Sequence, residues 1–374
     1  MVSSRDTIAA MKGERLFCLD ALRGLDMLLL CVIAPMICEF AGSFGFESHP
    51  FLSQFDHHWD RFTIYDMIMP LFIFMSGAAV PFALRKRLDG GECPRWPYWA
   101  HVLKRVAFLW VLGMAAQGNL LSFDPLKINP YCNALQSIAA GYLVCAAVLP
   151  VRKWQVRTAI TVSLLVVYTL LMAFGGDYTP EGNFAHKVDV AVLGCILPRG
   201  SACFPPGKYT WWLSTMAFAF TALAGMHMTE VLRSAYGVWR KASVMGAVGA
   251  GLLALGLVAV ACGIPCIKMI STTSFVLIST GVSTLLLAAL FVLTDIWRVR
   301  RGWGLVMLYG QASLVAYVIG AVWPQVPRYA ATLFTYGVPH LFGEGCMRFV
   351  NMTVSCIFIT FALWMWTKAR AGKN

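Results

Sequence analysis

The stretch FTIYDMIMPLFIFMSGAAVPFALRKR, residues 62–87, decides the fold class. Between Asp66 and Arg85 it holds no charged residue, and it is apolar over nearly its whole length. About 20 such residues are what an α-helix needs to cross a hydrocarbon layer of about 30 Å. Three consecutive basic residues end the run, as in a span that stops at the cytoplasmic surface. The stretch therefore predicts a transmembrane helix.

Apolar runs of this length recur along nearly the whole chain of 374 residues. With 59% hydrophobic and 13% charged residues, the sequence is too apolar for one soluble core. It predicts an all-α polytopic membrane protein that forms a single transmembrane domain, 1–374, with residues 1–18 as a cytoplasmic N-terminal segment. We expect about ten transmembrane helices, near residues 20 to 42, 60 to 84, 99 to 120, 132 to 150, 155 to 175, 209 to 232, 242 to 263, 272 to 296, 303 to 323 and 346 to 367.

Basic residues indicate the orientation of these spans. An even number places both termini on one side, and most of the 30 lysines and arginines fall on that side. The excess predicts that both termini are cytoplasmic. It also explains the net charge of +12 without nucleic acid as a partner. Segment 324 to 345 is broken by proline and glycine, which favours an outer re-entrant or interfacial piece.

Two histidines, His57 and His58, lie in the outer segment before the second span. A histidine of near-neutral pKa can accept a proton from an amine or hydroxyl without a metal. The alternative is that both merely solvate the loop or bind a stray metal. Asp66 follows inside the span, where an unpaired carboxylate costs several kcal/mol. It orients a histidine, holds a polar group of a ligand, or pairs with a neighbouring helix.

Asp20, Arg23 and Asp26 are spaced by three residues at the cytoplasmic start of the first span, so they lie near one face and can pair with each other. The functional alternative is a cytoplasmic basic mouth for the phosphates of a nucleotide such as coenzyme A. Besides Arg23, this mouth would use the clusters Arg85, Lys86 and Arg87, and Lys104 and Arg105. Gln136, at a span edge, is either a helix-packing residue or a ligand contact.

Several ordered stretches resemble one family, among them RLFCLDALRGLDMLLL (15–30), HHWDRFTIYDMIMPLFIFMSGAAVPFAL (57–84) and NALQSIAAGY (133–142). Over residues 19–374 the chain is similar to bacterial relatives of heparan-alpha-glucosaminide N-acetyltransferase, in the transmembrane acyltransferase superfamily. The resemblance implies transfer of acetyl from cytosolic acetyl-CoA, a co-substrate, to the amine or hydroxyl of an extracytoplasmic sugar such as a terminal glucosamine. It also implies the bacterial inner membrane, with the acceptor site facing the periplasm.

Carried over residue by residue, the resemblance assigns catalysis to His57 or His58 together with Asp66. It assigns binding of acetyl-CoA to Asp20, Arg23 and Gln136, and the basic mouth adds Arg105. The family histidine usually stands three residues before a tryptophan. Here that position is Asp56, because the histidines stand one and two residues before Trp59. A family asparagine late in the first span has no match. We favour His57.

Two mechanisms fit these residues: the histidine is a general base in a ternary complex, or a nucleophile that carries acetyl between two half-reactions. We favour the base. The expected partners are the lipid bilayer and a sugar or oligosaccharide, no metal is required, and the sequence leaves a homodimer open. The rival function is a non-enzymatic transporter or flippase for a sugar or glycolipid. The absence of an internal sequence repeat counts against it.

Overall fold

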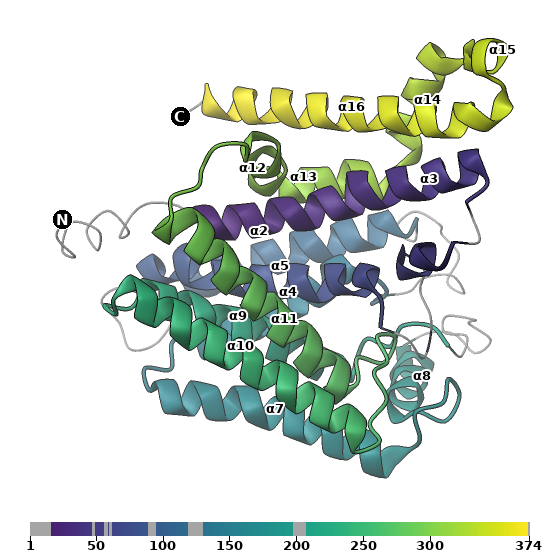
Figure 1. Cartoon of the computed structure of the whole chain (residues 1–374). Helices are drawn as coiled ribbons and strands as arrows, with labels where there is room; N and C mark the ends of the chain where they lie inside the picture. Colours follow the sequence, from purple (N-terminus) through teal and green to yellow (C-terminus); the bar gives the residue numbers. More distant parts are fainter. Residues whose placement is uncertain are drawn as a thin grey trace. The chain divides into compact units, whose positions relative to one another are not determined.

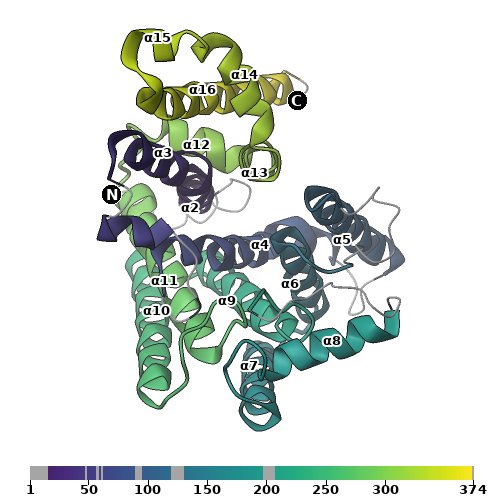
Figure 2. The same cartoon turned by 90° about the vertical axis from the view of Figure 1, so that its right-hand side faces the viewer.

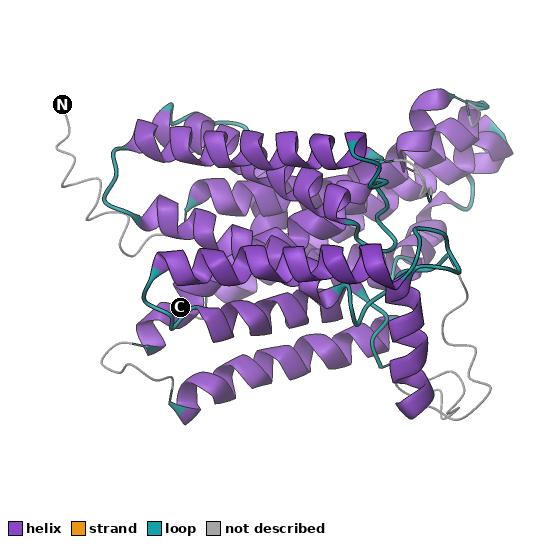
Figure 3. Cartoon of the chain, turned by 90° about the horizontal axis from the view of Figure 1, so that it is seen from below, coloured by secondary structure: helices purple, strands orange, loops and turns teal. Residues whose placement is uncertain are grey.

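The computed structural model describes residues 16–46, 49–55, 59, 62–88, 95–118, 130–196 and 207–372. Within these ranges the chain forms helices joined by loops, and no strand (Figures 1 and 3). The prediction of an all-α protein is confirmed.

Each of the ten ranges expected to span the membrane contains a helix. The first is a continuous rod, Phe17–Phe44, made of α2 (Phe17–Leu28), a π-helical turn (Leu29–Ile33) and α3 (Ala34–Phe44). The others are α4 (Ile68–Leu84), α5 (Trp96–Ala116), α6 (Ala134–Val148), α7 (Trp154–Gly175), α9 (Thr215–Arg233), α10 (Val238–Ala261), α11 (Thr273–Phe291), α12 (Gly304–Gln311) with α13 (Ser313–Tyr317), and α16 (Glu344–Ala371).

Seven helices in the described part of the chain are long and apolar enough to cross a membrane. An eighth span exists if the bent pair Gly304–Gln311 and Ser313–Val322 counts as one. Helix α6 has 15 residues, which at 1.5 Å per residue is shorter than the hydrocarbon layer. The protein is therefore a polytopic membrane protein, while the count of ten and the side of the termini stay predictions.

The C-terminal part departs from the expected straight span at 303 to 323. Its two helical pieces meet at 85°, so the chain turns sharply at Ala312 instead of continuing. The segment expected to be broken, 324 to 345, forms two short helices, α14 (Gln325–Thr335) and α15 (Val338–Phe342). Short helices of this kind agree with a segment that does not cross the membrane on its own.

Contacts divide the chain into two compact units. Unit 1 is built mainly from Met69–Ala288 and includes Trp59 and Phe62. Unit 2 contains α2 and α3, the segment Thr63–Ile68 and the chain from Ala289 onward. Both units consist of apolar helices, and the single-domain organisation stays a prediction.

Helix α9 is the centre of unit 1 and is buried over most of its length (Figure 2). Its partners include α4, α6, α7, α10 and α11. The approach to α4 is the closest, because a Cβ added to Gly77 would lie 1.8 Å from the carbonyl oxygen of Ala222. Gly225 repeats this contact, since its added Cβ would lie 2.0 Å from the carbonyl oxygen of Phe74. Small residues at membrane helix interfaces permit such backbone contact.

The close contact between α4 and α9 continues toward the C-terminal ends of both helices. The hydroxyl of Thr229 donates to the carbonyl oxygen of Ala78 at 2.8 Å, one turn beyond the glycines. Both helices then end together, α4 at Leu84 and α9 at Arg233. The glycine contacts therefore bring the charged ends of α4 and α9 into reach of each other.

In unit 2, α2 and α12 make the same kind of close backbone contact at glycines. A Cβ on Gly24 would lie 1.9 Å from the carbonyl oxygen of Val306, and one on Gly310 would lie 2.0 Å from that of Asp20. Helix α16 adds polar contacts to its neighbours, for example from the amide of Asn351 to the hydroxyl of Thr332 at 2.9 Å. Close glycine contacts thus organise both units.

Candidate functional site

The two candidate catalytic histidines, His57 and His58, lie outside the described residues. The next residue, Trp59, is described and is half-buried. In unit 1 it packs against an apolar cluster that includes Tyr168 of α7 and Phe275 of α11. The assignment of the catalytic base therefore stays a prediction.

Asp66 is buried at the start of the helix that continues as α4. It lies in the 3-10 turn Ile64–Met67, where its carboxylate accepts a hydrogen bond from the backbone N–H of Thr63 at 3.0 Å. The hydroxyl of Thr63 completes a capping box. This arrangement gives one reason why a buried carboxylate is tolerated here: it satisfies a backbone donor at the helix start.

Of the three charges at the start of α2, two pair. The guanidinium of Arg23 lies 3.1 Å from the carboxylate of Asp20. Asp26 is buried, and neither of its carboxylate oxygens has a hydrogen-bond partner among the described residues. The expected mutual pairing of all three is thus wrong for Asp26. Helical side chains lean toward the N-terminus, which directs Arg23 to the residue three positions before it.

Arg105 and Gln136, the other expected donor-binding residues, belong to unit 1. The guanidinium of Arg105 lies over the ring of Tyr142, 4.5 Å from its centre. The side chain of Gln136 caps α6: its oxygen accepts from the N–H groups of Cys132 (2.8 Å) and Asn133 (3.1 Å), and its nitrogen donates to the carbonyl of Pro130 (2.9 Å). These bonds give Gln136 the structural role of a helix cap. Its assignment to acetyl-CoA stays a prediction.

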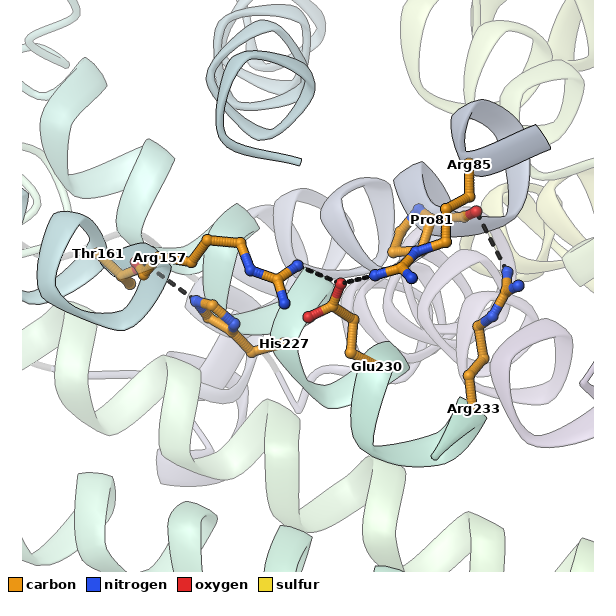
Figure 4. Close-up of polar contacts among 7 residues, drawn as sticks. All are labelled: Pro81, Arg85, Arg157, Thr161, His227, Glu230 and Arg233. Atoms are coloured by element: carbon orange, nitrogen blue, oxygen red, sulfur yellow. Dashed lines mark hydrogen bonds and ion pairs between the residues drawn. The ribbon is translucent and has the colours of Figure 1, made fainter. Parts of the chain in front are cut away.

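A cluster of charged residues gathers around Glu230 near the end of α9 (Figure 4). Of its members, the sequence singled out only Arg85. One carboxylate oxygen of Glu230 accepts from Arg85, which follows α4, at 2.6 Å. The same oxygen accepts from Arg157, in the first turns of α7. We name Arg85, Arg157, Arg233 and Glu230 the Glu230 cluster.

The members of the Glu230 cluster differ in exposure. The side chain of Arg157 is 7% exposed and that of Glu230 is 17% exposed, whereas that of Arg85 is 48% exposed. Arg233 donates to the carbonyl oxygen of Pro81 at 3.2 Å and lies over the ring of Phe82. Two arginines thus bind one carboxylate and a third follows three residues later on α9, so the cluster carries excess positive charge. Such a site attracts an anion, and paired guanidinium groups match phosphate well.

His227 lies one turn before Glu230 on α9, and its Nε2 atom is hydrogen-bonded to the hydroxyl of Thr161 on α7 at 3.0 Å (Figure 4). This bond holds α7 beside α9 at the level where Arg157 reaches Glu230. One sequence signal points to the cluster: Glu230 is the sole acidic residue between Asp189 and Asp295. A lone carboxylate in a long apolar region indicates a charged partner.

Asp189, on α8 (Phe184–Ile196), is a buried carboxylate in unit 1. Its two oxygens accept from the backbone N–H groups of Trp211 at 2.7 Å and Trp212 at 3.0 Å, which lie just before α9. Burial raises the pKa of Asp189 to about 6, although these backbone hydrogen bonds act in the opposite direction. Helix α8 is not one of the helices long and apolar enough to cross a membrane.

Asp189 should make unit 1 less stable as the pH rises. Its folded pKa, about 6, is above 3.8, the ordinary value of an aspartate, which we take for the unfolded chain. The contribution is therefore fully present below the lower value and is lost as the pH rises through the higher one, by roughly 3 kcal/mol. We expect the Asp189→Asn variant to lose this part of the pH dependence. Thermal unfolding of the purified protein between about pH 4 and pH 7 measures it; equal pH slopes in both proteins would contradict it.

Among the described residues, no three His, Cys, Asp or Glu side chains are grouped so that they could hold a metal ion. Residues 15–197 match a protein family described as "Domain of unknown function (DUF5009)". The match covers just under half of the chain. It includes Asp20, Asp66 and Arg157 and ends before α9, which carries Glu230. No curated protein matches the sequence.

Proposed function

We propose that this protein is a membrane acetyltransferase that takes acetyl from acetyl-CoA on the cytoplasmic side and transfers it to a sugar on the periplasmic side of the bacterial inner membrane. His57 is the general base, with His58 as the alternative, and Asp66 helps to place the reacting groups. The acceptor is the amine or hydroxyl of a sugar such as a terminal glucosamine. This proposal extends the resemblance that the sequence carries.

The observation that carries it is the Glu230 cluster. Coenzyme A bears several negative charges on its phosphates, and a protein that binds it needs more positive than negative charge at the site. The cluster supplies three guanidinium groups against one carboxylate. It lies where α4 and α9 end and α7 begins, the side that the basic residues predict to be cytoplasmic. Arg105 is also in unit 1. Its assignment to acetyl-CoA, like that of Arg23 and Asp20, rests on the sequence.

The proposed reaction is tested by the release of free CoA. Membranes that contain the protein should release CoA from acetyl-CoA only when an acceptor sugar is present, and the sugar should gain the acetyl group. Mass spectrometry of the sugar and a thiol assay measure both products. Membranes without the protein are the control. If sugar addition changes neither product for any amino or hydroxyl sugar offered, the acetyltransferase proposal fails.

The rival function, a transporter or flippase, predicts a different result. In that case Arg23 and Asp66 would line a path for a sugar or glycolipid, and the substrate would cross vesicles chemically unchanged. Recovery of the sugar inside proteoliposomes without an acetyl group would favour transport.

A further inference from the structure

The Glu230 cluster has the geometry of an anion held between two arginines, with a protein carboxylate in the anion's place. A single oxygen of Glu230 accepts from the guanidinium groups of Arg85 and Arg157, which come from two different helical segments (Figure 4). Phosphates are held in proteins in this way, by guanidinium groups that converge from separate elements.

Arg157 is the fixed half of this arrangement. Its side chain is 7% exposed, and its Nε atom is buried without a hydrogen-bond partner. A guanidinium offers five N–H donors, and an unused buried donor costs about 1 to 3 kcal/mol. Native structures rarely keep such a donor unless another group meets it at some stage. The unused donor of Arg157 therefore points to a further acceptor, and a phosphate provides several oxygens.

Arg85 is the adaptable half. Its side chain is 48% exposed and belongs to the short turn Arg85–Arg87 at the end of α4. It can follow an incoming ligand, because no neighbour packs it from all sides. Arg233 stays in place through the carbonyl of Pro81 and the ring of Phe82. A ligand can thus enter from the side of Arg85 and reach Arg157.

We propose that Glu230 is a specificity-determining residue of this site: its carboxylate stands in for a phosphate between Arg85 and Arg157, and a phosphate dianion of the ligand displaces it. The proposal rests on the proposed function in taking the acyl donor as the source of that phosphate. Three arginines and one glutamate leave two positive charges, which a dianion neutralises. A ligand with one negative charge or none gains too little to displace the carboxylate.

Two variants test this proposal, because they should change the affinity for coenzyme A in opposite directions. Glu230→Gln removes the competing charge and keeps the side-chain shape, so we expect coenzyme A to bind on the order of tenfold more tightly. Arg85→Gln removes one ligand of the phosphate, and binding should weaken by about tenfold. Arg240→Gln is the matched control, because Arg240 is exposed at the start of α10 and stacks on Tyr236 outside the cluster. Calorimetry of the full chain in phosphatidylcholine nanodiscs measures the affinity of each of the three variants for coenzyme A.

Glu230→Gln leaves the buried Arg157 without a counter-charge and can fail to fold. Glu230→Asp keeps the charge and withdraws the carboxylate by one methylene, so it should tighten coenzyme A binding by a smaller factor of about three. A folded Glu230→Gln or Glu230→Asp protein that binds coenzyme A no more tightly than the unchanged protein overturns the proposal. That result leaves the CoA-release assay untouched, so failure of this inference and failure of the proposed function are distinguishable.

Phosphatidic acid is a lipid whose headgroup is a phosphomonoester and carries the same dianionic phosphate chemistry, and a second arm separates the two sources. Nanodiscs with phosphatidic acid replace those with phosphatidylcholine, and the coenzyme A titration is repeated. If coenzyme A is the source, the Glu230→Gln effect persists in both lipids. If the effect appears instead as tighter retention of phosphatidic acid, with coenzyme A binding unchanged, Glu230 sets the specificity of a lipid headgroup site and the coenzyme A assignment is wrong.

Discussion

Replacing His57 with alanine is expected to lower acetyl turnover by on the order of a hundredfold or more, while acetyl-CoA binding is retained. A general base acts on the acceptor as it attacks the thioester, so its loss affects the chemical step more than the binding of the donor. Steady-state kinetics with the acceptor sugar, together with a separate binding titration of coenzyme A, measure the two effects independently.

His58→Ala is the matched comparison, because it removes the same type of side chain one residue away and should cost much less. The mechanism is read from the same pair of variants. A nucleophilic histidine would transfer radiolabelled acetyl to the protein without any sugar, and the label would vanish in the variant that lacks the nucleophile. If such labelling survives His57→Ala and disappears in His58→Ala, both the choice of His57 and the direct-transfer mechanism are wrong.

The sequence predicted the helices well because each is a long apolar run with polar ends. The ten expected ranges all contain helices, and 324 to 345 is broken by prolines and glycines into α14 and α15. It did not predict the 85° turn at Ala312, because only Gln311 and Ser313 interrupt the apolar run there and the range 303 to 323 contains no proline. Apolar periodicity reports burial or lipid contact, and it is silent on where an apolar helix bends.

The candidate site was harder to predict, for a physical reason. Charged residues at the ends of spans look alike in sequence whether they set topology, pair with one another or bind a ligand. In the sequence, Arg157 and Arg233 look like any basic residues beside a span, yet Arg157 is buried against Glu230. Gln136 had a clear structural alternative, and the structure gives it a helix-capping role. Which charges meet depends on helix contacts far apart in the chain, and single-sequence patterns do not contain them.

Gly77→Ala is expected to destabilise the protein by about 3 kcal/mol or more, although alanine is the better helix former by about 1 kcal/mol. The added Cβ would lie 1.8 Å from the carbonyl oxygen of Ala222 on α9, which is backbone and cannot rotate away. Helices α4 and α9 would have to separate along their length. The bond from Thr229 to Ala78 and the approach of Arg85 to Glu230 depend on the same spacing.

The control is Gly251→Ala on α10, where an added Cβ meets nothing within 4 Å. Helix propensity acts alone there, so this variant should be neutral or slightly more stable. Thermal unfolding of both purified variants in one detergent gives the comparison. Coenzyme A binding by the folded fraction of Gly77→Ala should also weaken, because Arg85 moves away from Arg157 with α4. If Gly77→Ala unfolds at the same temperature as Gly251→Ala, then α4 and α9 are not held together by backbone contact, and the Glu230 cluster does not depend on that contact for its geometry.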